Sequence, residues 1–175
     1  KKKYIYFSSY GQKLLGGDDN PTAINDESLL HDIKVSELSR EFMAYNFVNN
    51  VELEHQLHNK GEFYSRSGLV PDAVVEVTKN QTRFRIALEL ELTQKSRPRI
   101  LEKAKQYLMS RSYDQVIYLF ASEALMQSYR EKVQSIYPDE KSSKILFFYN
   151  EDLTRSTNVI RGAKGMYKGK SVFLK

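Results

Sequence analysis

The clearest pattern in the chain is an alternation of apolar and polar residues between positions 83 and 92. The even positions are all apolar, namely Phe84, Ile86, Leu88, Leu90 and Leu92. A strict period of two predicts a β-strand with one fully buried face. The other face, which meets water or a packed helix, carries two carboxylates, Glu89 and Glu91, with no cation between them.

The segment before this strand predicts its partner in a hairpin. A turn centred between Asn80 and Gln81 places Asp72 directly opposite Glu89. In the same register the other face pairs only apolar residues, in the pairs Leu69/Leu92, Pro71/Leu90, Ala73/Leu88, Val75/Ile86 and Val77/Phe84. One register therefore makes a continuous core face and gathers acidic side chains on the opposite face.

The gathered acids need an electrostatic explanation. Directly opposed side chains in a hairpin have Cβ atoms about 5 Å apart, so Asp72, Glu89 and Glu91 must protonate, pair with a cation or bind a metal ion. A divalent ion is one solution, because hard cations take clustered carboxylate oxygens. An arginine or lysine from the next helix is the other. Pro71 lacks an N–H and often marks a bulge, which would shift the register locally.

The rest of the chain predicts an α/β domain. Helical periodicity is expected over residues 28–48, 96–111 and 122–138, with buried strands over residues 114–121 and 144–150. Helix, strand, strand, helix, strand, helix, strand is an order typical of an α/β fold with a mixed sheet.

Composition narrows the class of protein. A chain of 175 residues suits one domain. The absence of cysteine excludes a disulfide framework, a thiolate zinc site and a cysteine nucleophile. No apolar run approaches membrane-spanning length and no signal peptide is visible. We therefore expect no membrane insertion and a cytoplasmic location.

Charge and turn signals divide the chain into three parts. Residues 1–25 end in a turn-rich linker, residues 26–150 hold the α/β pattern, and residues 151–175 are basic. The last part holds six Lys or Arg against Glu151 and Asp152, which accounts for most of the net charge of +5. A basic extremity predicts either a polyanion contact or a solubilising tail.

One motif carries a resemblance to a known class of enzymes. Pro71-Asp72, then sixteen residues, then Glu89-Leu90-Glu91, resembles the PD-(D/E)xK nuclease superfamily. The resemblance implies a restriction-endonuclease-like αβββαβ core, with a mixed central sheet flanked by helices, whose acids bind Mg²⁺ or Mn²⁺ and activate water. Glu91 stands where the motif has lysine, and in several branches that lysine has moved to the following helix.

The downstream sequence resembles the replication-relaxation family more closely. Its pattern of glutamate, acid, helical lysine and tyrosine four residues later is matched by Glu89, Glu91, Lys103 and Tyr107, and its histidine-aspartate by His31-Asp32. That family has an upstream winged-helix domain, and residues 4–15 resemble the last wing strand of such a domain. We therefore expect residues 1–25 to be its remnant plus a linker.

The nearest functional relative implied is the MobC-type (MOB-C class) plasmid relaxase, a resemblance that covers residues 4–150. It implies a metal-dependent DNA endonuclease that nicks transfer-origin DNA in plasmid mobilisation and conjugation. Other mobilisation proteins and a coupling protein are implied as further partners. Two alternatives stay open: a non-catalytic DNA-binding accessory protein of replication or mobilisation, and a restriction or repair nuclease of the same fold.

Roles follow from the resemblance for the acids and the lysine. Asp72, Glu89 and Glu91 are the expected metal ligands, and the expected catalytic set adds Lys103 and His31. Periodicity leaves Lys105 as a rival of Lys103, and the resemblance selects Lys103. Lys95, in the connection from strand to helix, is a third candidate. A hydrogen-bonded core position is the competing role for His31, and packing or a phosphate contact is expected of Tyr107.

Basic residues outside the acidic cluster predict DNA contacts. Arg97 and Arg99 open a helix, whose N–H groups also favour phosphate. Lys164 and Lys168 lie in the basic C-terminal part. Glu37 and Glu41, at the edge of the first helix's apolar stripe, are further candidates for an acid recruited to the site.

Overall fold

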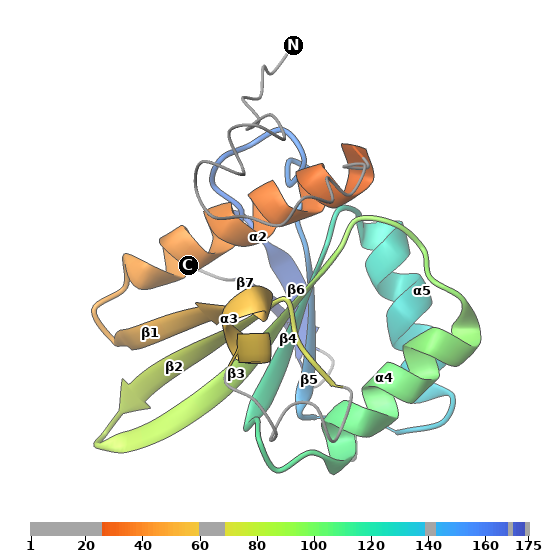
Figure 1. Ribbon diagram of the computed structural model, residues 1–175. Helices are drawn as coiled ribbons and strands as arrows, with labels where there is room; N and C mark the ends of the chain where they lie inside the picture. Colours follow the sequence, from red (N-terminus) through yellow and green to blue (C-terminus); the bar gives the residue numbers. More distant parts are fainter. Residues whose placement is uncertain (1–25, 60–68, 139–142, 168–169, 174–175) are drawn as a thin grey trace.

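A computed structural model describes residues 26–59, 69–138, 143–167 and 170–173. It contains a seven-stranded sheet in which every strand lies beside its neighbour in sequence (Figure 1). The described elements are α2 (Asp26–Met43), β1 (Val48–Leu53), α3 (Glu54–Asn59), β2 (Ala73–Lys79), β3 (Thr82–Glu91), α4 (Arg97–Met109), β4 (Gln115–Phe120), α5 (Glu123–Gln134), β5 (Ile145–Tyr149), β6 (Lys164–Tyr167) and β7 (Lys170–Phe173). The predicted α/β class, with a mixed sheet flanked by helices, is confirmed.

The centre of the sheet is parallel and its flanks are antiparallel. Strands β3, β4 and β5 run parallel and are connected through α4 and α5. The remaining neighbours pair antiparallel. The carboxyl ends of the three parallel strands therefore meet at one edge of the sheet, which is where open α/β sheets commonly bind ligands.

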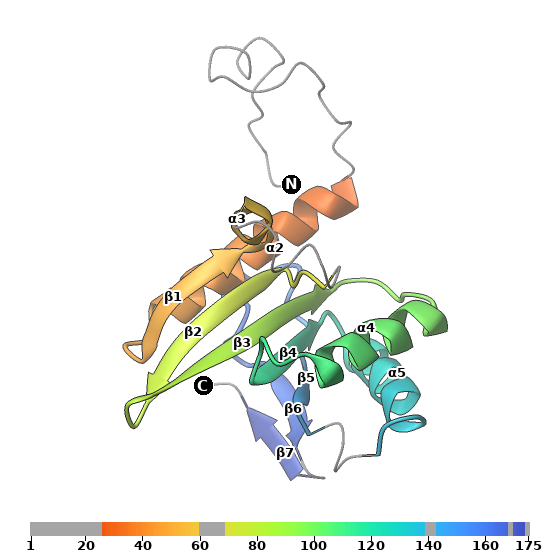
Figure 2. The same cartoon turned by 60° about the horizontal axis from the view of Figure 1, so that its bottom comes forward.

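Helices cover both faces of the sheet (Figures 1 and 2). A hydrophobic core lies on each face. On one face, the apolar side of β3, with Leu88 and Leu90, packs against Val35 and Leu38 of α2. On the other face, side chains of β2 and β3 pack against α4 and α5. The carboxylates of β3 therefore lie beneath helices, and their burial creates the electrostatic problem that the site must solve.

The hairpin has the predicted register. Asn80 and Gln81 both have positive φ, 50° and 64°, which is the backbone of the two-residue turn that suits the twist of a hairpin. The ladder pairs Lys79 with Thr82 at the turn and Ala73 with Leu88 at its far end. It stops there, one residue before Asp72. The predicted direct pairing of Asp72 with Glu89 is thus not part of the ladder.

The chain beyond residue 150, which we expected to be a basic tail, instead extends the sheet. β6 pairs with β5, and β7 pairs with β6. The segment between β5 and β6 buries four apolar residues against the α2 face, namely Leu153, Val159, Ile160 and Ala163. The charge of the segment did not predict the burial of these residues. Their burial packs the segment against the rest of the domain.

Some expectations fall on parts of the chain that the structure does not describe. The winged-helix remnant expected at residues 1–25 and the DNA contact expected of Lys168 lie outside the described residues. In the described part of the chain, no helix has the length and apolar character needed to cross a membrane.

The close approach of β6 to β5 generates a stability prediction. A Cβ at Gly165 would lie 2.5 Å from the carbonyl oxygen of Phe147 and 2.6 Å from the ring of Phe148. Because backbone must shift to relieve that contact, we expect Gly165→Ala to lower the free energy of unfolding by roughly 1–3 kcal/mol. Urea titration measures the loss. Thr157→Ala, at an exposed position of the preceding loop, is the control, and equal stability of the two variants would contradict this packing.

Candidate active site

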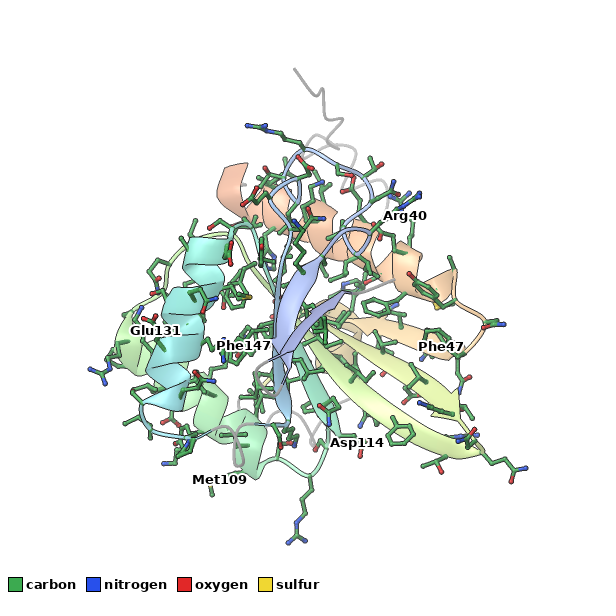
Figure 3. All side chains as sticks on the ribbon, turned by 180° about the vertical axis from the view of Figure 1, so that it is seen from behind. Arg40, Phe47, Met109, Asp114, Glu131 and Phe147 are labelled. Atoms are coloured by element: carbon green, nitrogen blue, oxygen red, sulfur yellow. The ribbon has the colours of Figure 1, made fainter. Side chains whose placement is uncertain are left out.

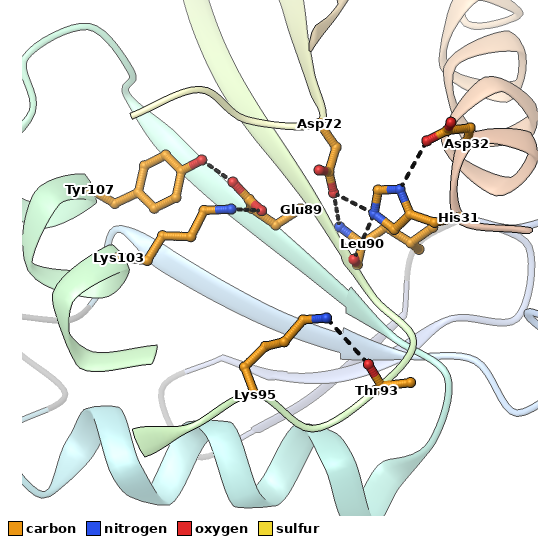
Figure 4. A network of polar contacts seen from close by, with 9 residues as sticks. All are labelled: His31, Asp32, Asp72, Glu89, Leu90, Thr93, Lys95, Lys103 and Tyr107. Atoms are coloured by element: carbon orange, nitrogen blue, oxygen red, sulfur yellow. Dashed lines mark hydrogen bonds and ion pairs between the residues drawn. The ribbon is translucent and has the colours of Figure 1, made fainter. Parts of the chain in front are cut away.

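The predicted site residues meet in a pocket of about 840 Å³ at the carboxyl end of β3. Its lining includes all five residues expected to be catalytic, namely His31, Asp72, Glu89, Glu91 and Lys103. They come from α2, the residue before β2, β3 and α4 (Figure 4). Elements far apart in sequence thus deliver one cluster of ionisable groups, which we call the acid pocket.

Glu89 is the most buried of the acids, with 1% of its surface exposed. Its Oε2 accepts a hydrogen bond of 2.5 Å from Lys103 Nζ, and its Oε1 accepts one from the Tyr107 hydroxyl (Figure 4). Lys103 and Tyr107 are four residues apart and so lie on one face of α4. Of the two rival lysines, Lys105 is exposed and does not line the pocket, whereas Lys95 does line it.

Burial controls the protonation of this pair. Burial raises the pKa of Glu89 to about 8; the positive charge of Lys103 opposes the rise and the negative charge of Asp72 adds to it. For Lys103, burial favours the neutral amine, but the charges of Glu89 and Asp72 outweigh it and raise the pKa. Lys103 therefore stays charged in the pocket, whereas Glu89 takes up a proton far more readily than an exposed glutamate does.

Glu91, two residues along β3, has a different partner. It is buried, and burial raises its pKa, against the charges of Lys103 and Lys95. The hydroxyl of Tyr129 on α5 hydrogen-bonds Glu91 and also accepts a bond of 3.2 Å from the backbone N–H of Lys95. Tyr129 thus links the carboxylate to the connection between β3 and α4.

Asp72 lies outside the β2–β3 ladder, and hydrogen bonds to its side chain and its carbonyl hold it in place. Its Oδ2 accepts a hydrogen bond of 2.7 Å from the N–H of Leu90, and its carbonyl accepts one of 3.0 Å from Glu54. The Nε2 of His31 lies 3.2 Å from the same Oδ2 and 3.2 Å from the carbonyl of Leu90 (Figure 4). The carboxylate therefore sits at the rim of the sheet, fixed between β3 and α2.

His31 is a charged partner rather than a core residue. Burial alone lowers its pKa, but the hydrogen bond and charge of Asp72, with a smaller contribution from Asp32, raise it to about 9. Its Nδ1 lies 3.4 Å from Asp32 Oδ1. At neutral pH the imidazolium therefore compensates Asp72 much as Lys103 compensates Glu89.

These pairings bear on the two explanations offered for clustered acids. For Glu89 the structure has a lysine of the following helix, which was the alternative to a metal. Among the described residues, no group of three or more His, Asp or Glu side chains is arranged to hold a metal ion. The donor chemistry nevertheless suits a hard divalent cation, since the three predicted acids are among the carboxylates that line one pocket. Asp72, Glu89 and Glu91 are the residues that would hold it.

The other predicted residues are distributed unevenly. Arg99 and Lys95 line the acid pocket, whereas Arg97 does not and donates a bond of 3.5 Å to Ser135. Lys164 lines a separate hollow. The recruited-acid role of Glu37 and Glu41 is not supported, because neither lines the acid pocket.

Some pocket residues escaped the sequence reasoning. Thr154 lines the acid pocket from the loop after β5, and Glu54 lines it from the start of α3. The signal for Thr154 was available, because parallel strands end at one edge and the loops after them lie together. The sequence did not predict the contact of Tyr129 with Glu91, because its spacing on α5 indicates only a buried position.

Comparison with other proteins adds no family assignment. No model of a known protein family matches the chain, and no curated protein matches it. The case for a function therefore depends on the geometry of the acid pocket and on the motifs that led to it.

The His31–Asp72 pair predicts a shifted histidine titration. We expect the His31 ring to titrate near pH 9 by NMR, because the folded pKa is about 9 against an ordinary value of 6.5. Stability from this pair is complete below about pH 6.5 and is lost as pH rises through 9. Asp72→Asn should lower the His31 pKa toward 6.5, since burial and only the smaller contribution of Asp32 then remain. Asp32→Asn should shift it less, and a wild-type value near 6.5 would contradict the pairing.

The Lys103–Glu89 pair predicts a stability loss that depends on pH. Lys103→Met leaves Glu89 buried without its cation, so we expect a loss of roughly 1–3 kcal/mol in urea titrations. The loss should grow above about pH 8, because wild-type Glu89 ionises there, whereas the variant's Glu89, without the charge of Lys103, keeps its proton to higher pH.

Two controls isolate the pair. Lys105→Met, exposed on the same helix, should change stability by less than about 0.5 kcal/mol. Adding Glu89→Gln to Lys103→Met should restore most of the loss, because the buried charge is then gone. Additive losses in the double variant would show that the two side chains do not depend on each other.

Proposed function

We propose that this protein is a metal-dependent DNA endonuclease of the PD-(D/E)xK type. The observation that carries the proposal is the convergence of Asp72, Glu89, Glu91 and Lys103 in one pocket. The motif resemblance selects the same four residues, and Lys103 reaches the acids from a different element. Perturbed ionisable groups in a cleft are a mark of functional sites.

The chain's own residues have distinct tasks in this proposal. A bound Mn²⁺ or Mg²⁺ would activate water and offset the charge that builds on the phosphate. Asp72, Glu89 and Glu91 would hold the ion. Lys103 would supply positive charge to the developing oxyanion, a role that preorganised cations fill in low-dielectric sites.

Hydrogen bonds from neighbouring residues keep the three acids in place. Tyr107 holds Glu89, Tyr129 holds Glu91, and the backbone N–H of Leu90 holds Asp72. His31 offsets the charge of Asp72 from the side of α2. Orientation of this kind fixes carboxylates in the geometry that a reaction requires.

The substrate proposed is transfer-origin DNA, nicked as in MobC-type relaxases during plasmid mobilisation. Arg99 lies in the pocket and opens α4, where backbone N–H groups also favour phosphate. A cytoplasmic location, other mobilisation proteins and a coupling protein as partners, and sequence recognition by an upstream winged-helix domain belong to the same proposal.

A second candidate function is favoured by one specific observation. Lys103 already pairs with Glu89, and His31 already pairs with Asp72. Such a network satisfies the buried acids without a metal ion, which suits a non-catalytic DNA-binding accessory protein of replication or mobilisation.

A nicking assay tests the proposal. Supercoiled plasmid carrying a transfer origin is incubated with the chain and Mn²⁺, Mg²⁺ or EDTA, and open circles are expected only with metal. Asp72→Asn and Glu89→Gln should each lower the nicking rate at least about a hundredfold. Glu76→Gln is the matched control, because this carboxylate of the same hairpin pairs with Arg85 outside the pocket.

The possible products separate the candidates. Linear DNA indicates a restriction or repair nuclease. DNA binding without cleavage in every metal supports the accessory protein. Normal nicking by Asp72→Asn would mean that the acid pocket is not the site. Mn²⁺ should also raise the melting temperature of the wild type and of Glu76→Gln, but not of Asp72→Asn, which tests ion binding without activity.

A further inference from the structure

The loop from residue 150 to residue 163, which joins β5 to β6, borders a second hollow of about 450 Å³. Three basic residues line it, Arg155, Arg161 and Lys164, and we call it the basic hollow. It adjoins the acid pocket through the chain itself, since Thr154 lines the acid pocket and the next residue lines the basic hollow.

The basic side chains of this hollow are accessible to a ligand. All three are exposed, and among the described residues none of them forms an ion pair with a carboxylate. Glu151 and Asp152 also line the hollow and are exposed. The excess charge is therefore small and positive, and three cations without a carboxylate partner in the described part of the chain line one hollow.

The backbone that carries these cations is fixed from beneath by charged groups of α2. The carboxylate of Glu41 accepts hydrogen bonds from the N–H groups of Val159 and Ile160, the second at 2.8 Å. Lys34 is fully buried and donates to the carbonyl of Ser156 and, at 2.6 Å, to a carboxylate of α2. Figure 3 shows this loop lying across α2 at the top of the view.

Such anchoring has an energetic consequence. A buried lysine is costly unless it is paired and hydrogen-bonded, so the contacts of Lys34 hold the loop in one conformation. Asn150 adds a bond of 3.0 Å from its side chain to the carbonyl of Val159. A fixed backbone that presents free cations loses little entropy when it binds an anion, which favours binding.

We propose that the basic hollow binds the phosphodiester backbone of the DNA strand that occupies the acid pocket. This inference rests on the proposed function for the identity of the strand. Arg155, Arg161 and Lys164 would contact phosphates beside the scissile bond, and the Thr154–Arg155 step would carry the strand from one hollow to the other. The guanidinium groups suit phosphate oxygens because their donors form a planar fork.

Fluorescence anisotropy with labelled single-stranded and duplex DNA in EDTA tests this site without cleavage. The variant Arg155→Gln/Arg161→Gln/Lys164→Gln should bind at least about tenfold more weakly in low salt, and the slope of log K against log[salt] should become shallower by about 2. The matched control is Lys79→Gln/Arg111→Gln/Lys105→Gln, which removes the same charge from exposed positions outside the described hollows. Equal effects of the two triple variants would overturn the inference.

A single variant separates loop anchoring from general attraction. Glu41→Gln removes a negative charge, so general attraction to DNA predicts tighter binding. Loss of the hold on Val159 and Ile160 predicts binding at least about threefold weaker, and tighter binding would overturn the inference. Circular dichroism checks that the fold is kept.

Different experimental outcomes would reject the basic hollow as a DNA-binding site and the endonuclease function. DNA binding that depends on the basic hollow, without nicking in any metal, rejects only the endonuclease. Nicking that is indifferent to the triple variant rejects only the hollow. A wild-type chain that does not bind DNA, or that binds only RNA of the same sequence, rejects the hollow as proposed.

Discussion

The structure depends on one buried carboxylate at the centre of its sheet. Glu89 lies on a strand covered on both faces, and an uncompensated charge there would cost several kcal/mol. Lys103 and Tyr107 remove that cost, and they do so only if α4 presents one particular face to β3. The rotation of α4, and with it the place of Arg99 at the pocket, follows from satisfying this side chain.

The same pairing of carboxylates with cations governs the chemistry of the acid pocket. The carboxylates Asp72, Glu89 and Glu91 lie in this pocket with the cations Lys103 and His31. Burial raises the pKa of Glu89 and of Glu91, so both take up protons more readily than exposed acids do. A divalent ion entering this pocket would compete with those cations for the same oxygens. An ion-pair network and a metal site are therefore two states of one set of side chains, and the balance between them depends on how readily Lys103 and His31 leave their partners.

A second set of charged groups organises the opposite side of the molecule. α2 directs a buried lysine and a glutamate at the backbone of the β5–β6 loop, rather than at another helix. That loop closes one side of the acid pocket through Thr154. α2 thereby reaches the acid pocket directly through His31 and indirectly through the loop, which makes it a structural support of both hollows.

The sequence by itself determined what backbone geometry dictates locally. The alternation in β3, the turn at Asn80-Gln81 and the four-residue spacing of Lys103 and Tyr107 are properties of one strand, one turn and one helix, and each predicts which side chains share a face. Local chain geometry is nearly independent of the rest of the fold, and for that reason the register and the candidate acids could be predicted.

Only the tertiary structure decided which partner each acid takes. Periodicity left Lys103 and Lys105 as rivals, and the packing of α4 brought Lys103 to Glu89. The ladder ended before Asp72, and α2 supplied its histidine; α5 supplied a tyrosine to Glu91. The strands after residue 150 were not predicted, because the charge of the segment does not indicate which of its apolar residues are buried. Contacts between distant segments arise from shape and burial in three dimensions, which no local pattern specifies.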